Sequence, residues 1–217
     1  KFTFYCDDNY KECTNDVNKL IDNKETLSNI NNFVHPFNSF KSINTSYDEY
    51  GQIDLEINKV YDEQDIIEIN NKINKIIKNK IKNNMTNEEK IKVIHDYIIN
   101  NGKYATDEIR KKNPNQSYNK ANNILIDGVG LCSAYADAMA IFLYEFGIDN
   151  YKIASDRHIW NLVKINNKWL HLDLTWDDPV TSTGIQKLED IFMLIDDDKL
   201  KELKVTQHKY NKTIYKE

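Results

Sequence analysis

The chain has 217 residues, of which 29 are Lys or Arg and 34 are Asp or Glu, so its formal net charge is −5. This balance lacks the basic excess that marks nucleic-acid-binding domains. No apolar run approaches the ~18 residues that a membrane-spanning helix needs. The composition therefore argues against nucleic acid as a partner and against a membrane-spanning segment, and it leaves a globular chain long enough for a substantial core.

The first sixty residues predict a strand, a helix and a strand. Apolar residues alternate at Phe2 and Phe4 and again over 53–57, and a stretch between them has helical spacing. We expect an accessory region over 1–61, followed by a second domain over 62–217. Cys6 and Cys13 lie close together in the first region. They form a disulfide or remain two reduced thiols, and spacing alone does not decide between these.

The next segments predict helices. Isoleucines at helical spacing indicate a helix from 63 to 81, and the capping box that begins at Thr86 indicates the start of a second. Residues 101–120 are polar and irregular, which is typical of a functional loop beside a site. A third helix is expected to begin at Cys132 and to end at Gly147.

An antiparallel sheet is expected after these helices. Apolar patterns predict strands at 151–155, 158–165, 168–175 and 191–195. The tail from Asp196 is expected to be a helix and then a strand, with the acidic run Asp196-Asp197-Asp198 serving as the helix N-cap rather than as a metal site. Helices first and a sheet later indicate the α+β class, with the helix that begins at Cys132 packed on the sheet.

Cys132 is the candidate nucleophile. It lies in Gly128-Val129-Gly130-Leu131-Cys132-Ser133-Ala134-Tyr135-Ala136, within the first turn of the predicted helix. Unpaired backbone N–H groups and the helix dipole favour a thiolate there. Gly128 and Gly130 would let the backbone approach a substrate and free the Cys132 N–H to face a carbonyl oxygen. A zinc site is not expected, because no second Cys or His stands near Cys132 at ligand spacing.

The candidate base and its carboxylate can be placed by strand register. Asn166-Asn167 predicts a two-residue hairpin turn, because Asn tolerates positive φ. This register sets Trp160 opposite Asp173 and makes His158 and Asp173 diagonal neighbours on one face, about 7–8 Å apart at the backbone. His171 shares that face and ranks second as a base. The opposite face is apolar and is expected to be the core.

These residues suggest an acyl-transfer mechanism. The Cys132 thiolate would attack a carboxamide carbon, and His158 would pass the proton to the departing amine. Asp173 would orient the imidazole and stabilise its charged form. For the oxyanion we expect the Cys132 N–H together with a side-chain donor, either the Tyr104 hydroxyl or the Trp160 indole, so both side chains are substrate-binding candidates.

Of the remaining histidines, His95 is interpreted as structural. His95 and Asp96 form a pair within a predicted helix. His35 and His208 lie outside any constellation that the sequence defines.

Three segments resemble the transglutaminase-like superfamily, and its bacterial members in particular. They lie within residues 86–180 and comprise 90–98, 128–136, and the block from 158–163 into 169–179. The resemblance implies a papain-like transglutaminase core and amide-directed chemistry without an organic cofactor. It also implies a catalytic triad of Cys132, His158 and Asp173, in agreement with the register argument.

Members of that superfamily include cross-linkers, peptidases, deamidases and amidases, and some have lost activity. We therefore expect cysteine-dependent acyl transfer or hydrolysis on peptide or glutamine-type amides, in the manner of a transglutaminase or a cysteine protease, with a protein or peptide as substrate. The alternative is a catalytically silent binding module at the cell surface. An extracellular or cell-surface location in a bacterium is expected, a cytoplasmic one stays open, and no oligomeric state is implied.

Overall fold

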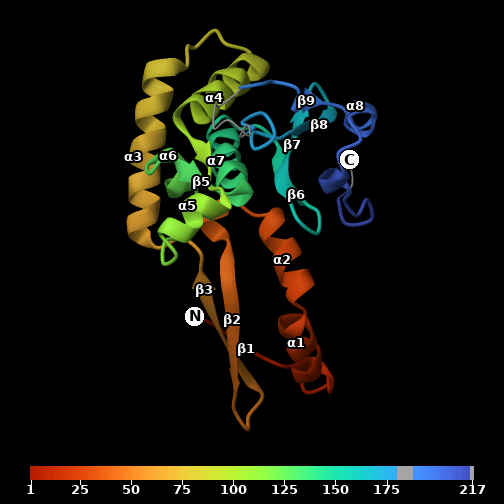
Figure 1. Cartoon of the computed structure of the whole chain (residues 1–217). Coiled ribbons are helices and arrows are strands. Elements are labelled where there is room, and N and C mark those ends of the chain that lie inside the picture. The colour runs from red at the N-terminus through yellow and green to blue at the C-terminus, as the bar shows by residue number, and fades with distance from the viewer. Residues whose placement is uncertain (180–187, 216–217) are drawn as a thin grey trace. The chain divides into compact units, whose positions relative to one another are not determined.

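A computed structural model describes residues 1–179 and 188–215 of the chain (Figure 1). The backbone divides into two compact units, Lys1–Asp62 and Glu63–Glu217. Among the described residues, no helix combines the length and the apolar character that crossing a membrane requires.

The first unit is a three-stranded antiparallel sheet with two helices and a 3-10 turn. The strands run in the order β1-β3-β2. The elements are β1 (Phe2–Tyr5), α1 (Cys13–Asp22), α2 (Lys24–Asn32), η1 (Pro36–Asn38), β2 (Phe40–Tyr47) and β3 (Gln52–Lys59). A disulfide joins Cys6 to Cys13 at the start of α1.

This unit corrects the strand–helix–strand expectation. The helical stretch is divided at Asn23, whose side chain accepts a hydrogen bond from the backbone N–H of Thr26 and so begins a new helix. Strand β2 was missed because its sequence, FKSINTSY, has no clear alternation of apolar and polar residues, and most of it is half-buried or exposed.

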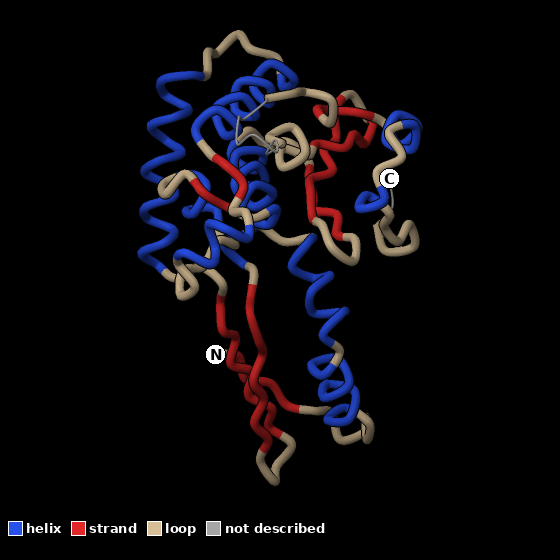
Figure 2. The backbone as a smooth tube through the Cα atoms, in the orientation of Figure 1, coloured by secondary structure: helices blue, strands red, loops and turns tan. Residues whose placement is uncertain are grey.

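Helices dominate the first part of the second unit (Figure 2). They are α3 (Glu63–Lys80), α4 (Asn87–Asn101), α5 (Asp107–Lys112), α6 (Ala121–Leu125) and α7 (Cys132–Glu145). The Thr86 capping box is confirmed, since its hydroxyl accepts from the Glu89 N–H while the Glu89 carboxylate accepts from the Thr86 N–H. The stretch expected to be irregular contains α5 and a short strand, β4 (Lys103–Tyr104), which pairs in parallel with β5 (Val129–Gly130).

A four-stranded antiparallel sheet follows, in the order β6-β7-β8-β9. Its strands are β6 (Asn150–Ala154), β7 (Ile159–Ile165), β8 (Lys168–Leu172) and β9 (Met193–Ile195). The predicted hairpin register is confirmed from Ile165 opposite Lys168 to Asn161 opposite Leu172. The strand expected to reach 175 ends at Leu172, so Asp173 lies just after β8. Asn166 and Asn167 between the two strands have φ values of 50° and 62°, the left-handed conformation that a two-residue turn of this kind requires.

Helix α7 packs against β6 and β7, which gives the expected α+β arrangement of a helix that begins at Cys132 lying on an antiparallel sheet. Nearly the whole helix is buried. The Asn161 side chain on β7 donates a 2.9 Å hydrogen bond to the Ala136 carbonyl. This bond joins the second turn of α7 to strand β7 of the sheet.

The other face of the sheet is also buried, contrary to the expectation of a single core face. Trp160 and Leu162 form a second cluster there with Ile153 and Tyr215. The C-terminal tail supplies this cover: it contains α8 (Asp197–Glu202) and η2 (Thr206–His208). The strand expected after the tail helix does not form in the residues described up to 215, whereas the Asp196 N-cap is confirmed by a 2.8 Å bond from the Lys199 N–H.

Candidate active site

The sulfur of Cys132 lies at the N-terminus of α7. Strand β5 leads into this helix, and the N–H of Leu131, the N-cap residue, donates a 2.8 Å bond to the buried Tyr118 carbonyl. Cys132 is half-buried and, with Cys6 and Cys13 joined, it is the free thiol among the cysteines. The first N–H groups of a helix have no acceptor within the helix, so the Cys132 N–H is available to an anion.

The glycines before Cys132 serve the turn and the packing, and their role in the approach of a substrate stays a prediction. Gly128 has a φ of +73°, which favours glycine. A Cβ on Gly130 would lie 2.7 Å from the Ala134 Cβ and 3.1 Å from the Ile124 Cβ. Gly130 therefore allows α6 and α7 to meet closely just before the nucleophile.

Gly130→Ala should lower the free energy of unfolding by about 1–3 kcal/mol, because neither Ile124 nor Ala134 can turn a Cβ out of the way. For a unit of this size that corresponds to a fall in melting temperature of roughly 5 °C. Thermal unfolding followed by circular dichroism measures it. An unchanged melting temperature would mean that α6 and α7 separate at little cost.

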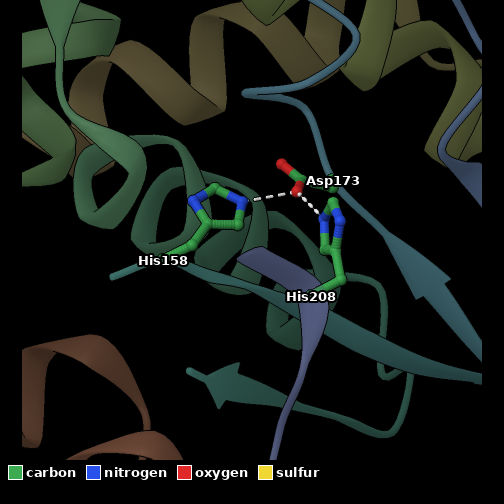
Figure 3. A group of neighbouring side chains, drawn as sticks. All are labelled: His158, Asp173 and His208. Atoms are coloured by element: carbon green, nitrogen blue, oxygen red, sulfur yellow. Dashed lines mark hydrogen bonds and ion pairs between the residues drawn. The ribbon is translucent and has the colours of Figure 1, made fainter. Parts of the chain in front are cut away.

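His158 and Asp173 lie side by side (Figure 3). His158 Nε2 is 2.5 Å from Asp173 Oδ2, and both side chains are buried. Because Nε2 bonds the carboxylate, Nδ1 is the ring nitrogen left for the thiol of Cys132, whose hydrogen bond and charge act on this imidazole. The structure thus brings together the three residues predicted to form the triad, while their catalytic role stays a prediction.

The surroundings of His158 favour its protonated form. Burial by itself lowers the pKa of the imidazole, but the charge and hydrogen bond of Asp173, with a further contribution from Cys132, raise it to about 9. An imidazolium at neutral pH beside a thiol at a helix N-terminus stabilises the thiolate. The pair is thereby arranged as a nucleophile and a proton donor.

The Asp173 carboxylate is fully supplied with hydrogen-bond donors. Oδ1 accepts from the backbone N–H groups of Thr175 at 3.0 Å and Trp176 at 3.2 Å, while Oδ2 accepts from His158. Burial would raise the pKa of this group, yet the charge and bond of His158 and a second imidazole bond hold it at about 2. Asp173 is therefore an anion throughout the physiological range.

The second imidazole belongs to His208, to which no sequence pattern assigns a role. His208 Nε2 lies 2.7 Å from the same Oδ2 atom of Asp173. It stands in η2, 35 residues after Asp173, in a segment without a regular hydrophobic period. No spacing rule links two residues so far apart, so only the folding of the tail over the sheet reveals the contact.

His158, Asp173 and His208 bring three potential metal ligands within 4.8 Å of one another. Their geometry fits a hydrogen-bonded network better than a metal centre. Each imidazole directs an N–H at one shared carboxylate oxygen, and a metal would need the nitrogen lone pairs instead. The remaining oxygen of Asp173 is already occupied by two backbone donors.

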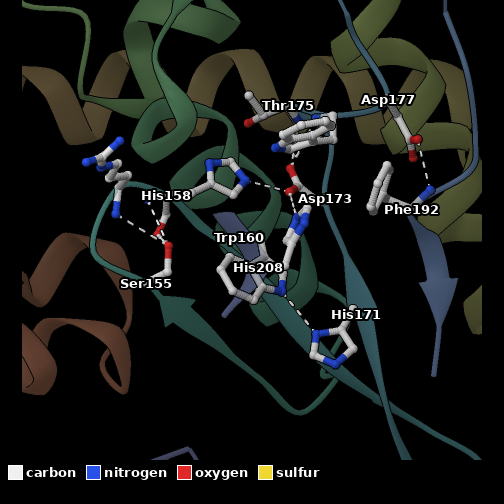
Figure 4. A network of polar contacts seen from close by, with 11 residues as sticks. Ser155, His158, Trp160, His171, Asp173, Thr175, Asp177, Phe192 and His208 are labelled. Carbon is white, nitrogen blue, oxygen red and sulfur yellow. Dashed lines mark hydrogen bonds and ion pairs between the residues drawn. The ribbon is translucent and has the colours of Figure 1, made fainter. Parts of the chain in front are cut away.

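The structure corrects the proposal for Trp160 as an oxyanion donor. Its side chain is 1% exposed and its indole N–H donates a 3.0 Å bond to His171 Nδ1 (Figure 4). This N–H is therefore engaged in the sheet and cannot reach a substrate. Burial lowers the pKa of His171 to about 4, so this imidazole is neutral at pH 7 and acts as a structural acceptor rather than as the base.

Tyr104, the other oxyanion candidate, lines a cleft of about 280 Å³ together with His158, Arg157 and Trp176. Burial, and then the charge of Cys132, raise the pKa of the Tyr104 hydroxyl. The hydroxyl consequently keeps its proton and lies close enough to the nucleophile to sense its charge. Its use as a donor to substrate stays a prediction.

Three further buried contacts fix the turn that follows Asp173. His95 Nε2 is 3.1 Å from Asp177 Oδ2, and the Phe192 N–H donates to Asp177 Oδ1 at 2.9 Å. The Tyr135 hydroxyl, on α7, donates to Asp178 at 2.5 Å. His95 is therefore structural, as expected, although it ties its helix to this turn as well as pairing with its neighbour in sequence.

The sequence model of the transglutaminase-like superfamily matches residues 74–174, a range that contains all three triad candidates. No curated protein matches the chain. Among solved structures, a crystal structure of a TGase is similar over 86% of this chain and 52% of its own, with 13% identity and a TM-score of 0.46. A candidate cysteine protease from Cytophaga hutchinsonii is similar over 63% of this chain and 62% of its own, with 13% identity and a TM-score of 0.38. The chain thus spans about half the length of the first and under two thirds of the second.

Proposed function

Through residues 74–174 the chain belongs to the transglutaminase-like superfamily, and we propose that it is a cysteine-dependent enzyme that cleaves or transfers the acyl group of peptide or glutamine-type amides. The observation that carries this proposal is the buried His158–Asp173 pair, whose free imidazole nitrogen serves the thiol at the start of α7. A fold kept only for binding would have no need of an imidazolium beside a thiol.

Acylation would begin with attack of the Cys132 sulfur on the amide carbon of a substrate lying in the cleft. The carbonyl π electrons move onto oxygen, where the Cys132 N–H and the Tyr104 hydroxyl are the proposed donors. The imidazolium of His158 then gives its Nδ1 proton to the departing nitrogen, the C–N bond breaks, and a thioester and a free amine or ammonia result.

Deacylation would use the same imidazole in the opposite sense. Neutral His158 takes a proton from water or from an acceptor amine as that group attacks the thioester carbon. The C–S bond then breaks and the Cys132 sulfur leaves as a thiolate, which restores the thiolate–imidazolium pair. Water yields hydrolysis or deamidation, whereas an amine yields a cross-link. An extracellular setting is part of the proposal, supported by the Cys6–Cys13 disulfide.

The test is the pH dependence of Cys132 alkylation by iodoacetamide. Because the pKa of His158 is raised to about 9, the imidazolium is present below that pH and is lost as the pH rises through it. The imidazolium beside the sulfur is therefore present at pH 6, and we expect alkylation of Cys132 there to be nearly as fast as at pH 8. In His158→Gln the thiol should behave as an ordinary cysteine, with a rate at pH 6 on the order of a hundredfold lower.

Turnover is measured on a glutamine-containing peptide, with mass spectrometry for cleavage or deamidation and a fluorescent primary amine for transfer. Cys132→Ala supplies the blank. Slow alkylation of the unmodified chain at pH 6, equal to that of His158→Gln, would contradict the proposal and favour a silent binding module.

A further inference from the structure

We propose that His208 is a positioning residue of this site, which holds the Asp173 carboxylate from the side opposite His158 and shares its negative charge. The inference depends on the proposed function only for its effect on turnover. Its structural basis is the double hydrogen bond to one oxygen atom: His158 Nε2 at 2.5 Å and His208 Nε2 at 2.7 Å both meet Asp173 Oδ2 (Figure 3).

The orientation of His208 is fixed by aromatic packing. Its ring stacks on Phe192 with centroids 5.0 Å apart and an interplanar angle of 23°, and it meets Trp160 edge-on at 4.9 Å. The side chain is 5% exposed, and its Nδ1 atom has no hydrogen-bond partner among the described residues. Among the described residues, Asp173 is therefore the hydrogen-bond partner of the His208 ring.

The direction of that bond follows from the acceptor. A carboxylate has no proton to give at neutral pH, so His208 Nε2 must carry the hydrogen. The rings of His158 and His208 are 5.3 Å apart with an interplanar angle of 86°, and both direct an N–H at the same oxygen of Asp173.

Sharing the carboxylate limits how tightly it holds the His158 proton. Each additional donor to Oδ2 draws electron density from the bond to His158, and without His208 the carboxylate would stabilise the imidazolium more strongly. An imidazolium held too tightly releases its proton poorly to a leaving amine, and it is too rarely neutral to activate water. His208 would thus keep His158 within the range that both half-reactions need.

The titratable groups that face the two rings are few. His158 faces Cys132 of α7, Asp173 and His208, and the same cleft is lined by Tyr104, Arg157 and Asp178. His208 faces Asp173 and His158, and it interacts electrostatically with His171. It also lines a second cavity, of about 510 Å³, whose charged groups are Asp197, Lys201, Lys204, Lys209 and Lys212.

The experiment is a proton NMR titration of His158 in the full chain, which requires no substrate. His208→Phe keeps the aromatic packing and removes the donor, and His208→Gln places an amide N–H where Nε2 was. The proposal expects His158 in His208→Phe to lose its proton about one pH unit higher than in the unmodified chain. In His208→Gln it should titrate close to the original value. His171→Asn is the matched control: it removes a buried imidazole from the same sheet face, keeps an acceptor for Trp160, and should leave the titration unchanged.

Turnover of His208→Phe should fall about tenfold, mainly in kcat, and the alkaline limb of its pH profile should move up with the titration. A second test removes the His208 side chain and replaces it with free imidazole, which can enter because His208 borders the 510 Å³ cavity. His208→Gly should show the same shift, and added imidazole should reverse it.

A His158 titration in His208→Phe that is unshifted, or shifted to lower pH, would overturn the proposal. If that variant does not fold, His208→Gly with and without imidazole decides in the same way. Absence of amide turnover in the unmodified chain would contradict the proposed function without affecting the His158 titration. Failure of the proposed function and failure of the His208 proposal are therefore distinguishable.

Discussion

Asp173→Asn should lower kcat/KM on an amide substrate by about a thousandfold or more. The reason is that all the neighbours of this carboxylate are donors. Oδ1 accepts from the N–H groups of Thr175 and Trp176, and Oδ2 accepts from two imidazoles. An asparagine has one acceptor and one donor end, so either orientation turns an NH₂ group toward groups that also donate.

Each orientation of the introduced carboxamide impairs the His158–Cys132 pair by a different mechanism. With NH₂ toward the imidazoles, His158 must move its proton to Nδ1 and can no longer accept one from the thiol of Cys132. With the amide oxygen toward the imidazoles, the tautomer survives, but the negative charge that raises the pKa of His158 is gone. Alkylation of Cys132 at pH 6 should therefore slow as well, on the order of a hundredfold.

Asp177→Asn is the matched control for this variant. Asp177 is also a buried carboxylate that bonds one imidazole and one backbone N–H, those of His95 and Phe192. Its side chain bonds none of the triad candidates, and its backbone N–H, which donates to the Asp173 carbonyl at 3.3 Å, is kept in the variant. We expect Asp177→Asn to cost stability while Cys132 keeps fast alkylation at pH 6. Equal losses of alkylation in both variants would trace the effect to the fold rather than to the Asp173 carboxylate.

At this site the sequence predicts well those features that depend on residues close together in the chain. The Asn166-Asn167 turn sets the hairpin register, because a two-residue loop of left-handed residues leaves little choice, and with it the placement of His158 near Asp173. The helix that begins at Cys132 is equally local, since its apolar run and Gly147 mark it in the chain. Both inferences use neighbours in sequence.

What the sequence does not predict depends on contacts between distant segments. His208 reaches Asp173 because the tail folds over the sheet, and Trp160 is covered by the same tail, so its indole serves His171 instead of a substrate. Periodicity reports which face of a strand is apolar, but here both faces are buried. A polar side chain on the second face is then indistinguishable in sequence from one that faces solvent.

Lys152→Met should destabilise the second unit by roughly 3–5 kcal/mol, which for its size corresponds to a fall in melting temperature of about 10 °C. Lys152 Nζ, on β6, lies 2.5 Å from Asp137 Oδ1, on α7, and their side chains are only 6% and 8% exposed. The single substitution leaves the buried Asp137 carboxylate facing an apolar group. The free-energy cost of that desolvated charge exceeds the stabilisation that the attraction between Lys152 and Asp137 supplies.

The double variant Lys152→Met with Asp137→Leu removes both charges and should recover most of the lost stability, since well-packed apolar residues replace buried ion pairs at little net cost. Thermal unfolding of the four members of this cycle measures the coupling.

Because Asp137 lies on the helix that carries Cys132, and β6 pairs with the strand that follows His158, the pair also fixes how helix and sheet are aligned. We therefore expect the stable double variant to alkylate Cys132 more slowly at pH 6 than the unmodified chain does. Unchanged alkylation would assign the ion pair to stability alone, and a single variant that melts like the unmodified chain would show that water reaches the Asp137 carboxylate.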